Sequence, residues 1–209
     1  MSQKKSRSKP QTKSKNQGNS NPQKKASELR IIGGEWRSRK VSFYPMEGLR
    51  PTLDRVRETV FNWLLPYMEG AQCLDLFAGS GALTFEALSR HAAFVHINEL
   101  NPKVRSTLEA QLTLLKCDTE RYNLTGFDGS KPNLLPDTRF DVIFLDPPFR
   151  KGLLETCCSE LEALDIFKPN SVIYIESEAS LETLLLPSNW RLQKHKKAGQ
   201  THYGLIERT

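Results

Sequence analysis

Beyond residue 70, short apolar runs alternate with segments whose apolar residues recur every three or four positions. Such alternation predicts strands separated by helices, and therefore an α/β fold with a mostly parallel sheet that helices cover on both faces. Residues 190–196 and 201–207 flank Ala198-Gly199-Gln200, which predicts a closing antiparallel hairpin. The runs that predict the other strands are 72–77, 93–98, 122–127, 140–145 and 171–176.

Two of the intervening helices are predicted from their ends or their spacing. Asn101 occupies an N-cap position and Pro102 the first helical position, after which apolar residues recur at helical spacing as far as Leu115. A further helix is expected over 153–167. Both would connect parallel strands of the sheet.

The first 69 residues follow a different pattern. Residues 1–28 are rich in Lys, Ser, Gln and Asn and contain almost no apolar residue, so we expect a disordered basic tail. Residues 29–69 are expected to form a lead-in to the main domain, which covers 70–209. The lead-in would contain a short hairpin over 29–43, with its turn at Gly33-Gly34, and a helix that begins near Thr52.

The net charge of +6 is unevenly distributed along the chain. Residues 1–27 carry eight Lys or Arg and no acid, whereas residues 58–209 carry fifteen basic and twenty acidic residues. A basic front on an acidic body favours a polyanionic partner held at one end. The alternative for residues 1–27 alone is a solvated tail that aids solubility.

Composition excludes several other classes. The apolar runs are far shorter than the ~20 residues of a membrane span, and the polar N-terminus does not resemble a secretory signal. We therefore expect a cytoplasmic protein without a membrane partner. No metal site or disulfide is expected either, because neither chemistry fits the spacing of the cysteines, which are Cys73, Cys117, Cys157 and Cys158.

The four residues Asp146-Pro147-Pro148-Phe149 follow the apolar run 140–145. Two prolines end a strand abruptly, because proline lacks the N–H that the ladder needs and fixes φ. The result is a rigid corner at the carboxyl end of a strand, where open α/β sheets bind ligands. It offers a carboxylate, a free carbonyl and an aromatic face, which together suit a planar amine.

A second motif precedes the helix that follows the first strand. Gly79 and Gly81 permit a tight turn and let a ligand lie against bare backbone. Asp75, before the glycines, can face a cationic amino-acid group, and Glu99, after the next strand, lies where an acid binds ribose hydroxyls. A nucleoside with a cationic amino-acid end is S-adenosyl-L-methionine.

From Arg30 to the C-terminus the chain resembles the bacterial 16S rRNA (guanine-N2)-methyltransferases of the RsmD family. The resemblance rests on Arg30–Arg37, on Arg50-Pro51-Thr52 with Asp54–Thr59, on Leu74–Leu83 and on Asp146–Phe149. It implies a seven-stranded class I methyltransferase sheet and a cytoplasmic, monomeric enzyme. The implied partner is 16S rRNA within the small ribosomal subunit.

The resemblance also assigns roles to individual residues. Asp75 and the glycine turn would hold the methionine group, Glu99 the ribose and Asp128 the adenine amine. Residues implied in cofactor binding are Asp75, Phe77, Ala78, Gly79, Gly81, Glu99, Leu100 and Asp128. Residues implied at the reacting amine are Asp146, Pro147, Pro148 and Phe149. Residues expected to contact RNA phosphates are Arg30, Arg37, Arg39, Lys40, Arg50, Arg55 and Arg57.

Methyl transfer at this corner would be an in-line displacement that needs no metal. Asp146 and the Pro147 carbonyl would each accept a hydrogen bond from the amine, and Phe149 would stack on the base. Whether Asp146 also takes a proton stays open, and we favour its role as acceptor and orienter. Because a stacked base cannot reach the corner, the target should be unpaired or flipped.

Two other functions remain open at this point. An adenine amino-methyltransferase acting on DNA can use the same corner, but usually carries a sizeable recognition region for which this chain has little room. A catalytically idle RNA-binding assembly factor is the other alternative. The intact glycine turn and proline corner argue against it.

Overall fold

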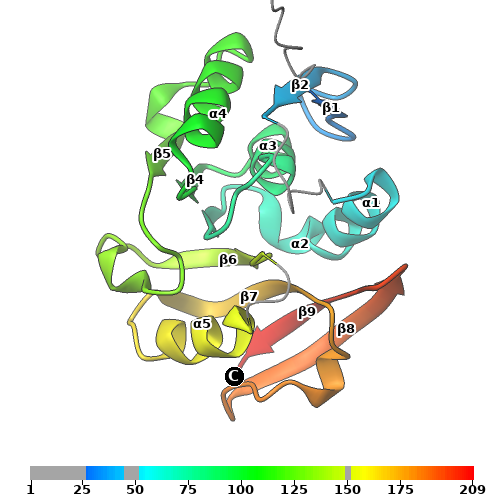
Figure 1. Ribbon diagram of the computed structural model, residues 1–209, viewed down its shortest axis with the longest axis vertical. Helices are drawn as coiled ribbons and strands as arrows, with labels where there is room; N and C mark the ends of the chain where they lie inside the picture. Colours follow the sequence, from blue (N-terminus) through cyan, green and yellow to red (C-terminus); the bar gives the residue numbers. More distant parts are fainter. Residues whose placement is uncertain (1–26, 45–51, 149–151) are drawn as a thin grey trace, which may run out of the picture.

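The computed structural model describes residues 27–44, 52–148 and 152–209. Its centre is a seven-stranded sheet with the strand order β5-β4-β3-β6-β7-β9-β8 (Figure 1). Strands β3 to β7 are mutually parallel, and β9 runs antiparallel to both β7 and β8. The strands are β3 (Gln72–Asp75), β4 (Phe94–Asn98), β5 (Tyr122–Thr125), β6 (Phe140–Leu145), β7 (Phe167–Ser177), β8 (Trp190–Ala198) and β9 (Thr201–Arg208).

The strand order places a topological switch point between β3 and β6. The chain moves outward from β3 to β4 and β5, then crosses back to β6 and continues to β7. The connections after β3 and β6 therefore leave in opposite directions. In open α/β sheets a ligand site forms at the carboxyl ends of the strands at such a point.

Two apolar clusters hold the helices against the sheet. One face packs against α1 (Asp54–Trp63), α2 (Leu65–Met68), α3 (Ala82–Ser89) and α4 (Pro102–Leu114). The other face packs against α5 (Leu153–Glu162), with Leu154 and Leu161 beneath β6 and β7. Side chains of β6 alternate between the two clusters, with Phe144 in the first and Leu145 in the second. Burial on both faces explains the continuous apolar run of this strand.

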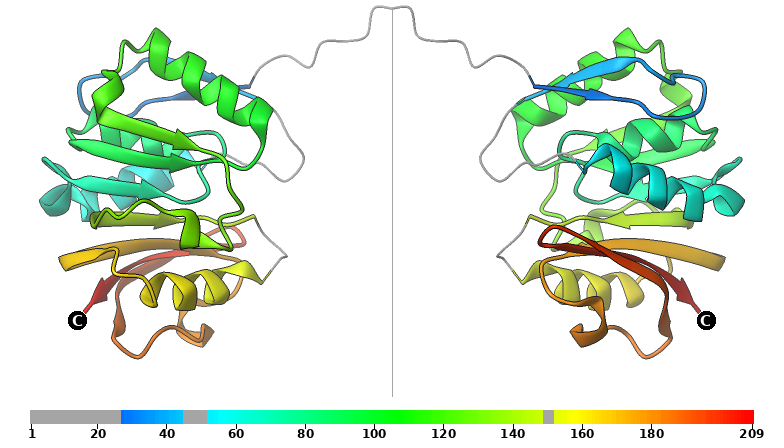
Figure 2. Two further views of the ribbon diagram at one scale, coloured as in Figure 1. Left: turned by 90° about the vertical axis from the view of Figure 1, so that its left-hand side faces the viewer. Right: turned by 90° about the vertical axis from the view of Figure 1, so that its right-hand side faces the viewer.

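The N-terminal hairpin forms a separate two-stranded sheet from β1 (Ser27–Arg30) and β2 (Lys40–Phe43) (Figure 2). Its Leu29 and Val41 join the same apolar cluster as α1 and α3. The expected tight turn at Gly33-Gly34 is part of a longer loop over 31–39, in which Gly34 has φ of 75°. The hairpin also begins at Ser27, earlier than expected, because Ser27 pairs with Phe43.

The predicted α/β fold with its seven-stranded sheet and terminal hairpins is confirmed. The Asn101 cap is also confirmed, because its Oδ1 accepts hydrogen bonds from the N–H groups of Lys103 and Val104 at 2.9 and 3.3 Å. The predicted helix over 153–167 is too long. It ends at Glu162, because Phe167 pairs with Phe140 as the first residue of β7.

Three short 3-10 turns lie between the longer elements: η1 (Thr119–Arg121) precedes β5, η2 (Pro132–Leu134) lies between β5 and β6, and η3 (Leu181–Thr183) follows β7. Among the described residues, no helix has the length and apolar character needed to cross a membrane.

Candidate active site

Four acidic residues lie where parallel strands end at one edge of the sheet. Asp75 is the last residue of β3 and pairs with Ile97 of β4 and Phe144 of β6. Glu99 directly follows β4, and Asp146 directly follows β6. Leu145 pairs with Ile175, so Asp146 is level with Glu176 near the end of β7. The register alone therefore sets these carboxylates side by side.

The glycine turn between β3 and α3 has the backbone shape that the sequence predicts. Gly79 and Gly81 have φ values of 51° and 77°, in the left-handed region that glycine favours. A Cβ on Gly81 would lie 2.5 Å from a ring carbon of Phe85 and 2.6 Å from Leu108. The turn therefore requires glycine for both its conformation and its packing.

Asp75 is held inside the protein beside this turn. Its side chain is buried, and the Thr84 hydroxyl donates a 2.6 Å hydrogen bond to it. Thr84 occupies the position of the third glycine in a dinucleotide-binding turn. A glycine there could not donate this hydrogen bond to Asp75. Burial raises the pKa of Asp75 to about 7. A cationic ligand group would restore the ionised form.

Glu99 supports the turn from the β4 side. Its carboxylate accepts a 2.9 Å hydrogen bond from the Gly79 N–H and a 2.7 Å hydrogen bond from the Asn101 N–H. A carboxylate has about four acceptor positions, so others remain for ribose hydroxyls. The neighbouring Leu100 is 60% exposed and offers an apolar surface at the same place.

The loop after β5 completes this half of the site. Asn98 donates 3.1 Å hydrogen bonds to the carbonyls of Leu76 and Phe127, which ties the loop to the end of β3. A Cβ on Gly129 would lie 2.6 Å from the Phe77 ring, so the loop approaches that ring closely. Asp128 accepts hydrogen bonds from the Ser130 N–H and hydroxyl. The structure thus gathers the predicted cofactor residues, including Ala78, around β3, β4 and β5.

The proline corner lies on the other side of β3. Asp146 is half-buried, Pro147 is buried and Pro148 is exposed, while Phe149 lies outside the described residues. The pKa of Asp146 is raised well above its usual value, first by burial and then by the charges of Glu176 and Asp75. The corner and the cofactor half of the site are therefore electrostatically linked.

Glu176 lies beside Asp146, and the sequence analysis did not identify it. Its buried carboxylate accepts hydrogen bonds from the Tyr174 hydroxyl at 2.7 Å and the Thr52 hydroxyl at 3.1 Å. Burial also raises its pKa. The available signal was its position, since it is an acid at the end of an apolar run, as Asp146 is. Through Thr52, Glu176 connects the start of the lead-in helix to the corner.

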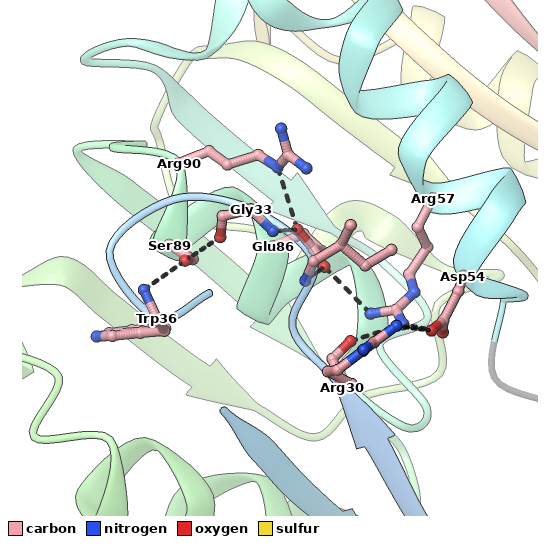
Figure 3. Close-up of polar contacts among 9 residues, drawn as sticks. Arg30, Gly33, Trp36, Asp54, Arg57, Glu86, Ser89 and Arg90 are labelled. Carbon is pink, nitrogen blue, oxygen red and sulfur yellow. Dashed lines mark hydrogen bonds and ion pairs between the residues drawn. The ribbon is translucent and has the colours of Figure 1, made fainter. Parts of the chain in front are cut away.

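The lead-in is anchored on α3 by buried charges (Figure 3). Glu86 is fully buried and accepts hydrogen bonds from the Ile32 N–H at 2.6 Å, from Arg57 at 3.3 Å and from Arg90 at 3.1 Å. One turn further along α3, the Ser89 hydroxyl accepts from the Trp36 N–H at 2.9 Å. The loop over 31–39 is therefore fastened to the helix that begins at the glycine turn.

The prediction that Arg57 contacts RNA is wrong. Its side chain is 1% exposed and is paired with Glu86 and with Asp54 at 2.6 Å. Its guanidinium is therefore occupied by carboxylates of the protein itself. The residue instead joins α1 to α3 inside the protein.

The other basic residues of the lead-in are exposed where the structure describes them. Arg30, Lys40 and Arg55 line a cavity of about 620 Å³ between the hairpin and the start of α1, which Thr52 also lines. Arg37 is exposed as well, and Arg39 donates to the carbonyls of Leu114 and Leu115. Arg50 lies outside the described residues. Their contact with RNA stays a prediction.

Within the described ranges, no three His, Cys, Asp or Glu side chains form a group that could hold a metal ion. The carboxylates at the strand ends instead lie around the backbone of the Gly79–Gly81 turn and the exposed apolar side chain of Leu100. This donor set suits a ligand with a cationic amino-acid end and a ribose. The fold is that of the class I S-adenosylmethionine-dependent methyltransferases.

Comparison with known proteins gives the family. The family model described as Conserved hypothetical protein 95 matches residues 29–207, and the chain belongs to this family. A Haemophilus influenzae protein named ribosomal RNA small subunit methyltransferase D is 47% identical over 184 residues, which cover 86% of this chain and 94% of that protein.

Solved structures agree. The putative methyltransferase yhhF from Escherichia coli superposes with a TM-score of 0.77 at 44% identity, covering 87% of this chain and 98% of that one. SMU.776, a putative methyltransferase complexed with SAH, shares the fold with a TM-score of 0.61 at 16% identity, covering 80% of this chain and 53% of that one.

The raised pKa of Asp75 predicts a pH-dependent contribution to stability. An unfolded Asp releases its proton near pH 3.8, whereas the folded one retains it to about pH 7. The folded state therefore binds more protons in this window, and stability falls as pH rises through it. Asp75→Asn should remove the effect. The unfolding free energy of the variant minus that of the wild type should therefore increase by up to about 4 kcal/mol from pH 4 to pH 8, at about 1.4 kcal/mol per pKa unit.

Urea unfolding of both proteins without cofactor, at a series of pH values, measures this difference. Asp146 and Glu176 titrate in both proteins, and loss of the Asp75 charge also lowers the pKa of Asp146, so the difference reports Asp75 together with its coupling to Asp146. A difference between variant and wild type that stays constant from pH 4 to pH 8 would show that Asp75 is not protonated by burial.

The Glu86 cluster predicts a large loss of stability on neutralisation. Glu86→Gln leaves the buried Arg57 and the Ile32 N–H without their carboxylate, which should cost about 3–5 kcal/mol of unfolding free energy. Glu109→Gln changes an exposed acid on α4 and should cost less than about 0.5 kcal/mol. Denaturant unfolding compares the two, and equal losses would contradict the anchoring role.

Proposed function

We propose that this protein transfers a methyl group from S-adenosyl-L-methionine to the exocyclic N2 amine of a guanine in 16S rRNA, within the small ribosomal subunit. The observation that carries the proposal is the Asp146-Pro147-Pro148 corner at the end of β6, directly beside the glycine turn that follows β3. The name of the Haemophilus influenzae relative supports a ribosomal RNA substrate.

The cofactor half of the site would be filled as follows. Asp75 and the backbone of the Gly79–Gly81 turn hold the amino-acid group, Glu99 the ribose hydroxyls and Asp128 the adenine amine. Phe77, Ala78 and Leu100 supply the surrounding surface. When bound, S-adenosylmethionine supplies a methyl group that its sulfonium has already activated for displacement. The protein must then orient the amine and stabilise the charge that develops on its nitrogen.

A guanine amine is a weak nucleophile, because its lone pair is delocalised into the ring. The Asp146 carboxylate and the Pro147 carbonyl can each accept one of its two hydrogens, which orients the lone pair away from both acceptors. Pro148 has no N–H, so no backbone donor at that residue competes for the amine's acceptors. The negative potential of the acceptors also favours the positive charge that develops on nitrogen.

Glu176 contributes to the electrostatics of this corner. Its charge is the second cause, after burial, of the raised pKa of Asp146. The ionised Asp146 is the stronger acceptor and carries the negative charge that favours the transition state, so the low-pH side of activity is governed by a carboxyl that titrates above the range of an exposed Asp. Tyr174 and Thr52 hold Glu176 in place, and Thr52 brings the lead-in to the reaction centre.

Asp146→Asn and Asp146→Ala test the proposal. Asn has nearly the same shape but presents an amide that includes a donor, so both variants should lose at least about 100-fold in kcat, as typical for removal of one preorganised polar contact. Cofactor affinity should stay within a few-fold, because Asp75 and Glu99 are untouched. Labelled methyl transfer to small ribosomal subunits measures turnover, and equilibrium binding measures cofactor affinity.

Asp137→Asn, at an exposed loop residue before β6, is the matched control and should keep wild-type turnover. Unchanged turnover in Asp146→Asn would remove the carboxylate from the mechanism. Methyl transfer to duplex DNA but not to ribosomal substrates would replace the proposed function with an adenine amino-methyltransferase.

A further inference from the structure

The closing hairpin concentrates positive charge in an otherwise acidic part of the chain. Residues 190–202 contain four Lys or Arg and no Asp or Glu, whereas residues 58–209 as a whole carry five more acidic than basic residues. These cations lie outside the lead-in, where the sequence analysis expected RNA contacts. The register of β8 and β9 shows where these cations lie relative to Asp146.

The register places the hairpin level with the reaction corner. Leu145 pairs with Ile175, which puts Asp146 beside Glu176, and Glu176 pairs with Tyr203, which in turn pairs with Lys196. Lys196 is thus three strands from Asp146, or roughly 14 Å at about 4.8 Å per strand. Figure 2 shows the tip of the β8–β9 hairpin at the same edge of the sheet as the carboxyl end of β6.

Three lysines of β8 are available for contact with a partner. Lys194, Lys196 and Lys197 are exposed, and no acid within the described ranges forms an ion pair with them. We call them the hairpin lysines. By contrast, His195 pairs with Glu182 at 3.7 Å. Arg191 lies near the start of β8, at the end of the strand far from the hairpin tip.

The hairpin lysines lie on both faces of β8, because successive residues of a strand point to opposite faces. A register shift between Leu192 and Lys194 resets the alternation, after which Lys196 shares a face with Tyr203. Its ammonium lies 5.9 Å from the Trp63 ring centre, and that ring stacks on Tyr203. Because Trp63 is the last residue of α1, the lead-in helix connects directly with the hairpin.

We propose that the hairpin lysines bind backbone phosphates of the RNA strand that flanks the target nucleotide. This inference rests on the proposed function and extends its site. A distance of roughly 14 Å corresponds to about four stacked nucleotides at about 3.4 Å each. The RNA strand would then cross the reaction corner between the lead-in cations, such as Arg30 and Arg55, and the hairpin lysines.

The alternative role for lysines on an edge strand is to prevent pairing with another sheet. That role requires no alignment with the active site and affects neither the affinity for RNA nor its salt dependence. The two roles therefore differ in a measurable quantity.

The test variant is Lys194→Gln, Lys196→Gln and Lys197→Gln combined in the full chain. Its control, matched in charge, is Lys116→Gln, Arg139→Gln and Arg191→Gln, which removes the same charge from exposed residues at the other end of the strands; of these three, Arg139 is paired with Asp165. Affinity for a 16S rRNA fragment is measured as a function of salt, and kcat and KM are measured with small ribosomal subunits.

Three lost phosphate contacts should lower the slope of log affinity against log salt by about 2, at about 0.7 per single-strand contact. The affinity at about 0.1 M salt should fall about 10- to 100-fold, KM should rise with it, and saturated kcat should stay within about twofold. The control should change neither slope nor KM appreciably. Equal slopes in the two variants, or a loss confined to kcat, would overturn the inference.

The proposed function fails separately. If the wild-type protein does not methylate ribosomal substrates at all, the enzyme assignment is wrong, while the binding measurement still decides whether the hairpin lysines contact RNA. If the wild type is active and the test variant matches it in affinity and KM, the function stands and only the hairpin contact is rejected.

Discussion

Parallel pairing of β3 with β4 and β6 is the constraint on which the site depends. A parallel ladder brings the carboxyl ends of neighbouring strands to one edge, with spacing set by backbone hydrogen bonds. Asp75 is the last residue of β3, and Glu99 and Asp146 directly follow β4 and β6, so the backbone ladder sets the spacing of these positions. A register error of one residue in β6 would turn Asp146 toward the wrong face of the sheet.

The acidic side chains at these strand ends carry a free-energy cost, because they are partly or fully buried. Asp75 and Glu176 are buried and Asp146 is half-buried, and burial is the largest cause of the raised pKa in each. Such a group of acids destabilises the folded protein at neutral pH. This cost is typical of a site organised to receive a positively charged ligand. The buried Glu86 cluster differs, because Arg57 and Arg90 neutralise it and it serves to attach the lead-in.

Much of this arrangement could be predicted from the sequence, because it depends on local signals. Strand ends, the glycine turn and the Asn101 cap are each determined by residues within a few positions. Arg57 shows the limit of reasoning from residue type. As an arginine it suggested a phosphate contact, yet it shares a helical face with Val60, Phe61 and Leu64. That spacing was the signal that it points inward.

Long-range pairing accounts for the remaining misses. Nothing near Glu176 in the sequence shows that it meets Thr52, because 124 positions separate them. Likewise, only the strand order β6-β7-β9-β8 brings the hairpin lysines level with the corner after β6. The end of α5 was misjudged because Phe167 belongs to an extended strand that pairs with β6 rather than to the apolar stripe of the helix.

The central claim is that the corner after β6 methylates the N2 amine of a guanine in 16S rRNA. Mass spectrometry of nucleosides from 16S rRNA tests it most directly, with rRNA taken from cells that have or lack this protein and each modified fragment mapped to its position. The account predicts that one N2-methylguanosine disappears in the cells that lack the protein and returns when wild-type protein, but not Asp146→Asn, is supplied. An unchanged set of methylated guanines, or loss of a methylated adenine instead, would contradict it.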